Sequence, residues 1–187
     1  MSGDLSIVVN GRPEAVLLDR LLDVTRSLEA RFYAAEGNTA LVTMARNILV
    51  HEGGPVLVVH DAATLDARQA AEKVALSSFA ISSVAAAETF AVFAFVPQVE
   101  VMLFEAPSML QRNLPEFDAS GLSLKVGLLS PRPTLEGVLA GRGIEREEFY
   151  RSLTPDDIRK MSTGPQASAF LSAVDGLIAA GAVSEAA

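Results

Sequence analysis

The chain has 187 residues, a formal net charge of −8 at pH 7, and a composition that is 50% hydrophobic. This length and apolar content exclude a disordered chain and fit one folded domain with a small appendage. The absence of cysteine excludes disulfides, thiolate zinc sites and cysteine nucleophiles. The acidic charge disfavours nucleic-acid binding, although a local groove, a metal ion or a basic partner could still support it.

No segment is predicted to cross a membrane. The longest apolar stretch, 90–104, is interrupted by Pro97, Gln98 and Glu100, and it is too short and too broken to span a bilayer. Residues 1–10 lack a basic region followed by an apolar one, so no signal peptide is expected. We therefore expect a cytoplasmic protein without a membrane partner.

Strand and helix patterns alternate through the first part of the chain. The β-branched run 5–9 predicts a buried strand that ends at Asn10-Gly11, and Pro13 favours the start of a helix. Further strands are predicted at 30–35, 55–60 and 90–96. Helices are predicted at 13–28, 40–51 and from 64 or 66 to 78, with 80–89 open between helix and strand.

The remainder of the chain changes character. Residues 97–112 predict a helix with a break at Pro107, and the Gly- and Pro-containing segment 115–133 predicts a loop. Short helical patterns follow at 135–139, 146–152, 155–161 and 167–180. We therefore divide the chain into an α/β domain, 1–114, and a loop with a helical C-terminal extension packed on it, 115–187.

The alternation of strands and helices predicts an α/β fold. Right-handed crossovers would build a small, doubly wound, mainly parallel four-stranded sheet of Rossmann-like type, flanked by helices and followed by a helical C-terminal subdomain. In such sheets ligands bind beyond the carboxyl ends of the strands. A functional site is therefore expected at the strand ends, which carry Asn10-Gly11, Glu36-Gly37, His60-Asp61 and Val96-Pro97-Gln98.

Taken together, the strand ends resemble the Toprim (topoisomerase–primase) family, especially small Toprim-like proteins related to OLD-type nucleases. In that family a first strand ends in Glu-Gly, a later strand ends in Asp-x-Asp, and a further strand runs into Pro-x-x-Glu. The corresponding segments are 7–15, 36–38, 58–64 and 96–100, so the resemblance covers about residues 5–112. It implies carboxylates that hold Mg²⁺ for phosphoryl transfer.

Two acidic positions of the family lack a carboxylate in this chain. The family's glutamate falls on Asn10, and the second aspartate of Asp-x-Asp falls on Ala63. Asp61 remains, with Glu100 as a second candidate, whereas Mg²⁺ prefers several carboxylates or a substrate phosphate. We therefore expect no cofactor and at most weak Mg²⁺ binding. The expected remnant site consists of Asn10, Gly11, His60, Asp61, Ala63 and Glu100.

Each of these residues also has a purely structural interpretation. Asn10-Gly11 suits a tight turn, because both residues tolerate positive φ. Asp61 can cap the following helix, and Glu100 is favourable at a helix N-terminus. A lone histidine such as His60 is more often a hydrogen-bonded structural residue than a ligand.

Three functions are consistent with these residues. The first is a Toprim-like protein that has lost metal-dependent catalysis and acts as a non-catalytic binding or interaction protein, linked to nucleic-acid processing. The second is a Mg²⁺-dependent nuclease or phosphotransfer enzyme that uses Asp61 and Glu100. The third is a small-ligand or interaction module that shares only the α/β topology. We favour the first.

The apolar surplus predicts a protein partner or a homo-oligomer. A domain of this size buries only about 70% of the surface of its extended chain, and exposed apolar patches usually mark interfaces. The candidate surfaces are the segment 90–104 and the C-terminal third, where 167–178 carries an apolar stripe at helical spacing. The alternative for that stripe is packing on the sheet.

Overall fold

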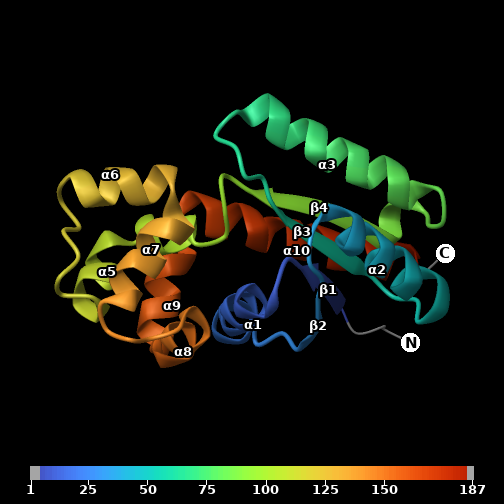
Figure 1. Cartoon of the computed structure of the whole chain (residues 1–187). Coiled ribbons are helices and arrows are strands. Elements are labelled where there is room, and N and C mark those ends of the chain that lie inside the picture. Colours follow the sequence, from blue (N-terminus) through green and yellow to red (C-terminus); the bar gives the residue numbers. More distant parts are fainter. Residues whose placement is uncertain (1–4, 185–187) are drawn as a thin grey trace.

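A parallel sheet forms the centre of the molecule in the computed structural model, which describes residues 5–184 (Figure 1). The sheet has four strands in the order β2-β1-β3-β4, and every pairing is parallel. The strands are β1 (Leu5–Val9), β2 (Ala30–Ala34), β3 (Val56–Asp61) and β4 (Phe90–Phe95). The predicted α/β class and the four-stranded sheet are therefore confirmed, with each strand end within one residue of its predicted position.

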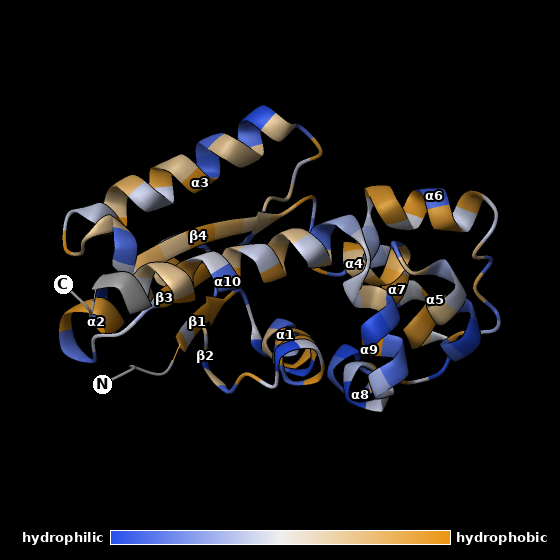
Figure 2. Ribbon diagram, turned by 180° about the vertical axis from the view of Figure 1, so that it is seen from behind, coloured by the Kyte–Doolittle hydropathy of each residue, from blue (hydrophilic) through white to orange (hydrophobic). Residues whose placement is uncertain are grey.

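Helices cover both faces of the sheet, which makes it doubly wound. The connecting helices are α1 (Arg12–Arg26), α2 (Asn38–His51) and α3 (Ala67–Ser82). The α1 helix packs on one face together with α10 (Pro165–Ser184), whereas α2 and α3 lie on the other face (Figures 1 and 2). Because helices cover both faces, every residue of β1 and of β3 is buried.

Alternation along the strands sorts their residues into two apolar clusters. Leu57 and Val59 of β3 pack in the cluster that contains α1, and Val58 packs in the cluster that contains α2. Successive side chains of a strand point to opposite faces. Asp61 therefore shares the α1 face with Val59, and His60 shares the α2 face with Val58.

The order of the strands reverses at the boundary between β1 and β3. Helix α1 leads from β1 to β2 on one side, whereas α2 crosses to β3 on the other side of β1. The carboxyl ends of strands at such a reversal form a crevice, which is the usual ligand position in open α/β sheets.

The middle of the chain departs from the sequence prediction. The predicted loop 115–133 is wrong in part, because it contains α6 and the start of α7. The expected break at Pro107 lies between α4 and α5, and the undecided segment 80–89 completes α3 and forms η1 before β4. The elements are η1 (Ala87–Thr89), α4 (Val101–Phe104), α5 (Pro107–Asn113), α6 (Leu122–Leu129) and α7 (Pro131–Ala140).

The last helices share a core with the sheet. They are α8 (Arg146–Ser152), α9 (Pro155–Ser162) and α10. Helices α8 and α9 pack on α1, and Phe170 of α10 contacts Phe93 and Phe95 of β4. One continuous apolar cluster thus runs from the sheet into the C-terminal extension.

The two segments that were candidate interfaces lie mostly in this core. Phe95, Val99 and Phe104 are almost fully buried, as are Phe170 and Val174 of the α10 stripe. The apolar side chains that remain exposed lie mainly on α3 and α6 instead. Within residues 5–184, no helix is both long and apolar enough to cross a membrane.

Candidate functional site

Three carboxylate side chains meet at the carboxyl edge of the sheet. Glu14 lies in the first turn of α1, Asp61 ends β3, and Glu100 follows β4 immediately before α4. Their side chains are 4%, 9% and 0% exposed, respectively. Since β1, β3 and β4 are neighbours in the sheet, the topology alone brings these three positions together at the strand-order reversal.

Two arginines from the C-terminal extension bind all three carboxylates. In the first turn of α7, Arg132 Nη2 lies 2.7 Å from Glu14 Oε1 and 2.5 Å from Asp61 Oδ2. Its Nε lies 2.9 Å from Glu100 Oε1. At the start of α8, Arg146 Nη1 lies 2.9 Å from Glu14 Oε1 and 2.5 Å from Glu100 Oε1. We call these five residues the carboxylate–arginine cluster.

Glu100 is the most enclosed member of the cluster. Besides the two arginines, its Oε1 accepts a hydrogen bond of 3.3 Å from the hydroxyl of Tyr150, which is fully buried. Its Oε2 accepts a hydrogen bond of 3.3 Å from Arg132 Nη2. Burial, reinforced by the charge of Glu100, raises the pKa of Tyr150, so the phenol keeps its proton. Both oxygens of Glu100 are thus bound by protein donors.

Asp61 is held by Val99 and Lys73 as well as by its ion pair with Arg132. Its Oδ1 accepts a hydrogen bond of 3.0 Å from the backbone N–H of Val99, and its own carbonyl accepts one of 2.6 Å from Lys73 Nζ. Burial raises the pKa of Asp61, and Glu100 adds to this, while Arg132 opposes it. Because the pKa remains raised, the ion pair with Arg132 does not fully offset the cost of burial.

The carboxylates outnumber the guanidinium groups of the cluster by one. Burial lowers the pKa values of Arg132 and Arg146, but hydrogen bonds to Glu100 and to Glu14 outweigh it and hold both values above the ordinary range. Both arginines are therefore permanently charged. Glu14 Oε2 is buried and has no hydrogen-bond partner among the described residues. The excess negative charge is thus enclosed at the edge of the sheet.

The positions of the arginines are unusual for helices. Arg132 and Arg146 lie in the first turns of α7 and α8, where the helix dipole disfavours a positive charge. The buried carboxylates of the sheet edge reverse this disadvantage, because each guanidinium group contacts at least two of them. The cluster therefore joins the C-terminal extension to the sheet.

Of the residues predicted for the site, the structure brings Asp61 and Glu100 together and directs Asn10 elsewhere. Asp61 and Glu100 share Arg132. The Asn10 Oδ1 atom accepts a hydrogen bond of 3.0 Å from the backbone N–H of Gly37, which ties the loop after β1 to the loop after β2. Asn10 thus has a structural role, as a link between two loops, and the positive φ that a tight turn can use occurs at Gly11 and not at Asn10.

Gly11 and Ala63 contribute backbone geometry. Gly11 has a φ of 117°, and a Cβ atom there would lie 2.6 Å from Glu14 Oε2. The absence of a side chain at Gly11 therefore makes room for Glu14. Ala63 has a φ of 55°, and its N–H donates a hydrogen bond of 2.8 Å to the carbonyl of Pro97. It links the loops after β3 and β4.

His60 lies on the opposite side of the sheet from the cluster. It is fully buried, and neither ring nitrogen has a hydrogen-bond partner among the described residues. Burial, and then the charge of Lys73, lowers the pKa of His60 to about 4. The imidazole is therefore neutral at physiological pH.

The sequence prediction missed Glu14, Arg132, Arg146 and Tyr150. Glu14 occupies a polar position of an amphipathic helix, where a solvated carboxylate is the ordinary interpretation. The sequence signal that could have identified Glu14 is its place in the first helical turn after a strand end. For Arg132 and Arg146 the signal is a positive charge in the first turn of a helix, where the helix dipole disfavours it.

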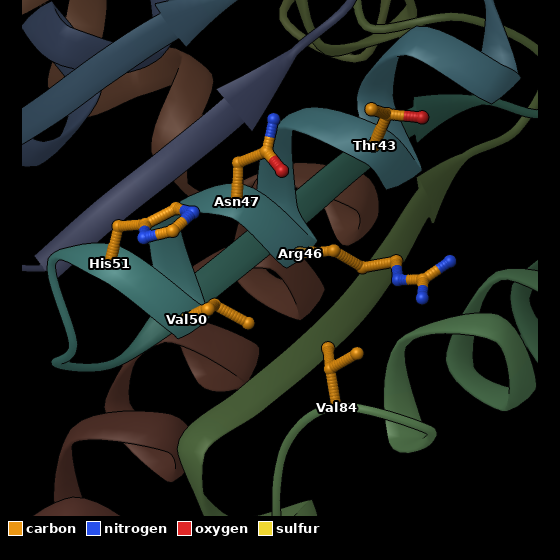
Figure 3. Close-up of a pocket in the computed structure, with 6 residues that line it drawn as sticks. All are labelled: Thr43, Arg46, Asn47, Val50, His51 and Val84. Atoms are coloured by element: carbon orange, nitrogen blue, oxygen red, sulfur yellow. The ribbon is translucent and has the colours of Figure 1, made fainter.

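Two hollows on the surface lie away from the cluster. One, of about 170 Å³, is lined by Thr43, Arg46, Asn47, Val50, His51 and Val84. Figure 3 shows the side chains of Arg46, Asn47 and His51 extending from α2 in different directions, so that they do not converge. The other, of about 520 Å³, lies between α1, β2 and α8 and includes Asp19, Asp23 and Arg151. Neither contains a member of the cluster.

The residues present do not fit the divalent ion that the family resemblance implies. Nitrogen atoms of Arg132 and Arg146 stand where the three carboxylates converge, within 3.3 Å of Glu100, Asp61 and Glu14. A divalent cation needs these oxygens unpaired and would be repelled by the guanidinium groups. Among residues 5–184, no group of three or more His, Asp or Glu side chains is arranged to hold a metal ion. No protein-family model, curated protein or solved structure matches the chain.

Proposed function

We propose that this chain is a Toprim-like protein that has lost metal-dependent catalysis and acts as a non-catalytic interaction protein. The observation that carries this proposal is the carboxylate–arginine cluster. Arg132 and Arg146 supply, within the chain, the positive charge that the three buried carboxylates require. The crevice at the strand-order reversal then acts as an internal joint between the sheet and the C-terminal helices.

The chemistry of arginine supports this role. A guanidinium group stays protonated at any pH at which the protein is folded and offers several donors in a fixed plane. It is therefore a permanent counter-ion, unlike a metal that exchanges with solvent. The side chains of Arg132 and Arg146 are only 19% exposed, which limits the access of a substrate phosphate to the carboxylates.

The changed acidic positions support the same conclusion. The side-chain oxygen of Asn10 accepts a hydrogen bond from the backbone N–H of Gly37, and Ala63 has no side-chain oxygen. A phosphoryl-transfer site needs ligands that hold the metal and leave coordination positions for the substrate. The cluster retains three carboxylates, but five of their six oxygens already accept hydrogen bonds from protein donors.

The second candidate is a Mg²⁺-dependent nuclease or phosphotransfer enzyme, and one observation favours it. Glu14, Asp61 and Glu100 all come within 3.3 Å of a single atom, Arg132 Nη2. Three converging carboxylates are a donor set that Mg²⁺ can use. This function requires Arg132 and Arg146 to withdraw, so that a metal can replace them.

Isothermal titration calorimetry with MnCl₂ distinguishes the two functions. For the wild-type protein we expect no binding tighter than about 1 mM, and no cleavage of plasmid DNA in the presence of Mn²⁺ or Mg²⁺. The double variant Arg132→Ala, Arg146→Ala removes both guanidinium groups and should bind Mn²⁺ more tightly if it folds. The control Arg151→Ala, on the surface of α8, should behave as wild type. Micromolar Mn²⁺ binding or DNA cleavage by the wild-type protein would overturn the proposal.

A further inference from the structure

Exposed apolar side chains gather on α3 and α6. In Figures 1 and 2, which are opposite views about a vertical axis, both helices lie along the same upper margin of the molecule. On α3, Leu76 is 71% and Phe79 is 80% exposed, and on α6, Leu122 is 75% and Leu129 is 59% exposed. Apolar groups gathered in this way usually mark an interaction surface.

The α6 helix exposes apolar side chains beside Lys125 on its outer side, and it also packs on its inner side. On the inner side Gly127 packs so closely on Phe104 that a Cβ atom would lie 2.1 Å from the ring. On the outer side Leu122, Val126 and Leu129 face solvent. Apolar side chains gathered on the outer side of a surface helix are usually covered by another element or a partner. The outer side of α6 therefore requires a cover.

The outer sides of α3 and α6 complement each other. Each carries two apolar residues and one charge at helical spacing: Glu72, Leu76 and Phe79 on α3, and Leu122, Lys125 and Leu129 on α6. Both rows extend over seven residue steps, or about 10 Å of helix. Glu72 and Lys125 are exposed and have opposite charges. In the parallel register that sets Glu72 opposite Lys125, Leu76 lies opposite Leu129, and Phe79 and Leu122 flank these pairs at opposite ends.

We propose that the cover is a second copy of this chain. The α3 helix of one copy packs against α6 of the other, and a two-fold axis repeats the contact with the roles exchanged. Both apolar rows are then covered at once, and Lys125 of each copy approaches Glu72 of its partner. The two helices carry more basic than acidic residues, with Arg68, Lys73 and Lys125 against Glu72, whereas the whole chain has a net charge of −8. The acidic excess that makes two copies repel each other therefore lies outside these two helices.

The available area is adequate for a dimer. Besides the four exposed residues on the two rows, Leu65 is 55% and Val126 is 44% exposed. Six side chains of this kind expose on the order of 600 Å² together. A standard specific interface buries about 800 Å² on each partner, including its polar rim. The apolar residues thus supply most of such an interface.

Sedimentation velocity of the purified chain from about 1 to 100 μM tests the proposal. We expect a dimer for the wild type and a monomer for Phe79→Ser. Glu72→Lys and Lys125→Glu should each weaken the dimer about tenfold or more, and the combined variant should restore it to within about threefold. The control Val50→Ser, at an exposed apolar residue of α2, should leave the dimer unchanged.

Circular dichroism of each variant checks that these surface changes preserve the fold. A wild type that is monomeric throughout the concentration range would overturn the proposal. A different protein would then be the partner that covers the apolar residues of α3 and α6. A dimer that withstands Phe79→Ser, or single charge reversals that do not rescue each other, would also overturn it. Metal binding is not involved, so these outcomes are separate from the test of the proposed function.

Discussion

Replacing Arg132 with methionine should strongly destabilise the protein. The guanidinium group contacts Glu14, Asp61 and Glu100, whose side chains are at most 9% exposed. Methionine keeps an unbranched side chain, but it leaves Glu14 and Glu100 with Arg146 alone and removes the arginine that pairs with Asp61. Removing one partner of a buried ion pair costs about 3–5 kcal/mol. We expect a loss of that size in the free energy of unfolding at neutral pH, where a typical domain has about 5–15 kcal/mol.

The loss should become smaller as the pH falls. Burial raises the pKa of Asp61 above its ordinary value of 3.8, and Arg132 opposes this rise. Without Arg132 the pKa rises further. A carboxyl group whose pKa is raised by folding adds to the free energy of unfolding at low pH. This contribution is complete when the pH is below the ordinary pKa, and it is lost as the pH rises through the pKa of the folded state. The variant therefore gains stability from proton uptake at a higher pH than the wild type does.

Urea unfolding followed by circular dichroism, at about pH 7.5 and about pH 5.5, measures both effects. The control Arg151→Met removes an arginine whose pair with Glu147 lies at the surface of α8. It should cost less than about 1 kcal/mol at either pH. A loss below about 1 kcal/mol for Arg132→Met, or a larger loss that is the same at both pH values, would refute the reasoning.

Two further predictions concern the packing of α6 and the buried imidazole. Gly127→Ala should lower the melting temperature by about 3–8 °C, because the added Cβ would clash with Phe104. The matched control Gly137→Ala, where a Cβ meets nothing within 4 Å, should leave the melting temperature unchanged or raise it. His60→Leu should maintain or raise the free energy of unfolding by about 1 kcal/mol, because it removes a buried ring without a described hydrogen-bond partner. Burial lowers the pKa of His60 to about 4, so the contribution of its neutral ring to stability is complete above pH 6.5 and is lost as the pH falls through 4. Urea unfolding of the variant at different pH values should therefore lack this part of the pH dependence.

The sheet could be predicted because its strands carry their signal locally. The run from Leu5 to Val9 and the run from Val56 to Asp61 are apolar nearly throughout, and turn residues follow both. A strand covered by helices on both faces needs this composition, so the pattern in the sequence and the burial in the structure have the same cause. The alternation with amphipathic helices then fixes the parallel arrangement.

The α6 helix could not be predicted in the same way. Gly121 precedes it, Gly127 lies within it, and Pro131 follows it, so local propensity favours a loop. What stabilises the helix is the contact of Gly127 with Phe104 of α4, which brings two separate elements together. A residue that weakens a helix locally is here the residue that allows it to pack.

The candidate site was predicted only in part. The prediction used the position of a residue at a strand end but not the face of the sheet to which its side chain points. Asn10, Asp61 and Glu100 were expected in one site; Asp61 and Glu100 both contact Arg132, whereas the side chain of Asn10 binds Gly37. Neighbouring residues of a strand point to opposite faces, so His60 could not join Asp61 in one site. The arginines lie 71 positions from Asp61 and 46 positions from Glu100, so their partners follow from the packing of α7 and α8.

The cluster and the proposed dimer should influence each other, because α6 and α7 are joined by Ser130 alone. Arg132 anchors the start of α7 to the sheet, and the outer side of α6 would rest on the second copy. If loss of Arg132 frees α7, then α6 loses its fixed orientation, and the dimer must supply the free energy to restore it. We therefore expect Arg132→Met to weaken the dimer by about tenfold in sedimentation, whereas Arg151→Met should not. An unchanged dimer in a folded Arg132→Met variant would show that Gly127 alone orients α6, and that the two sites are independent.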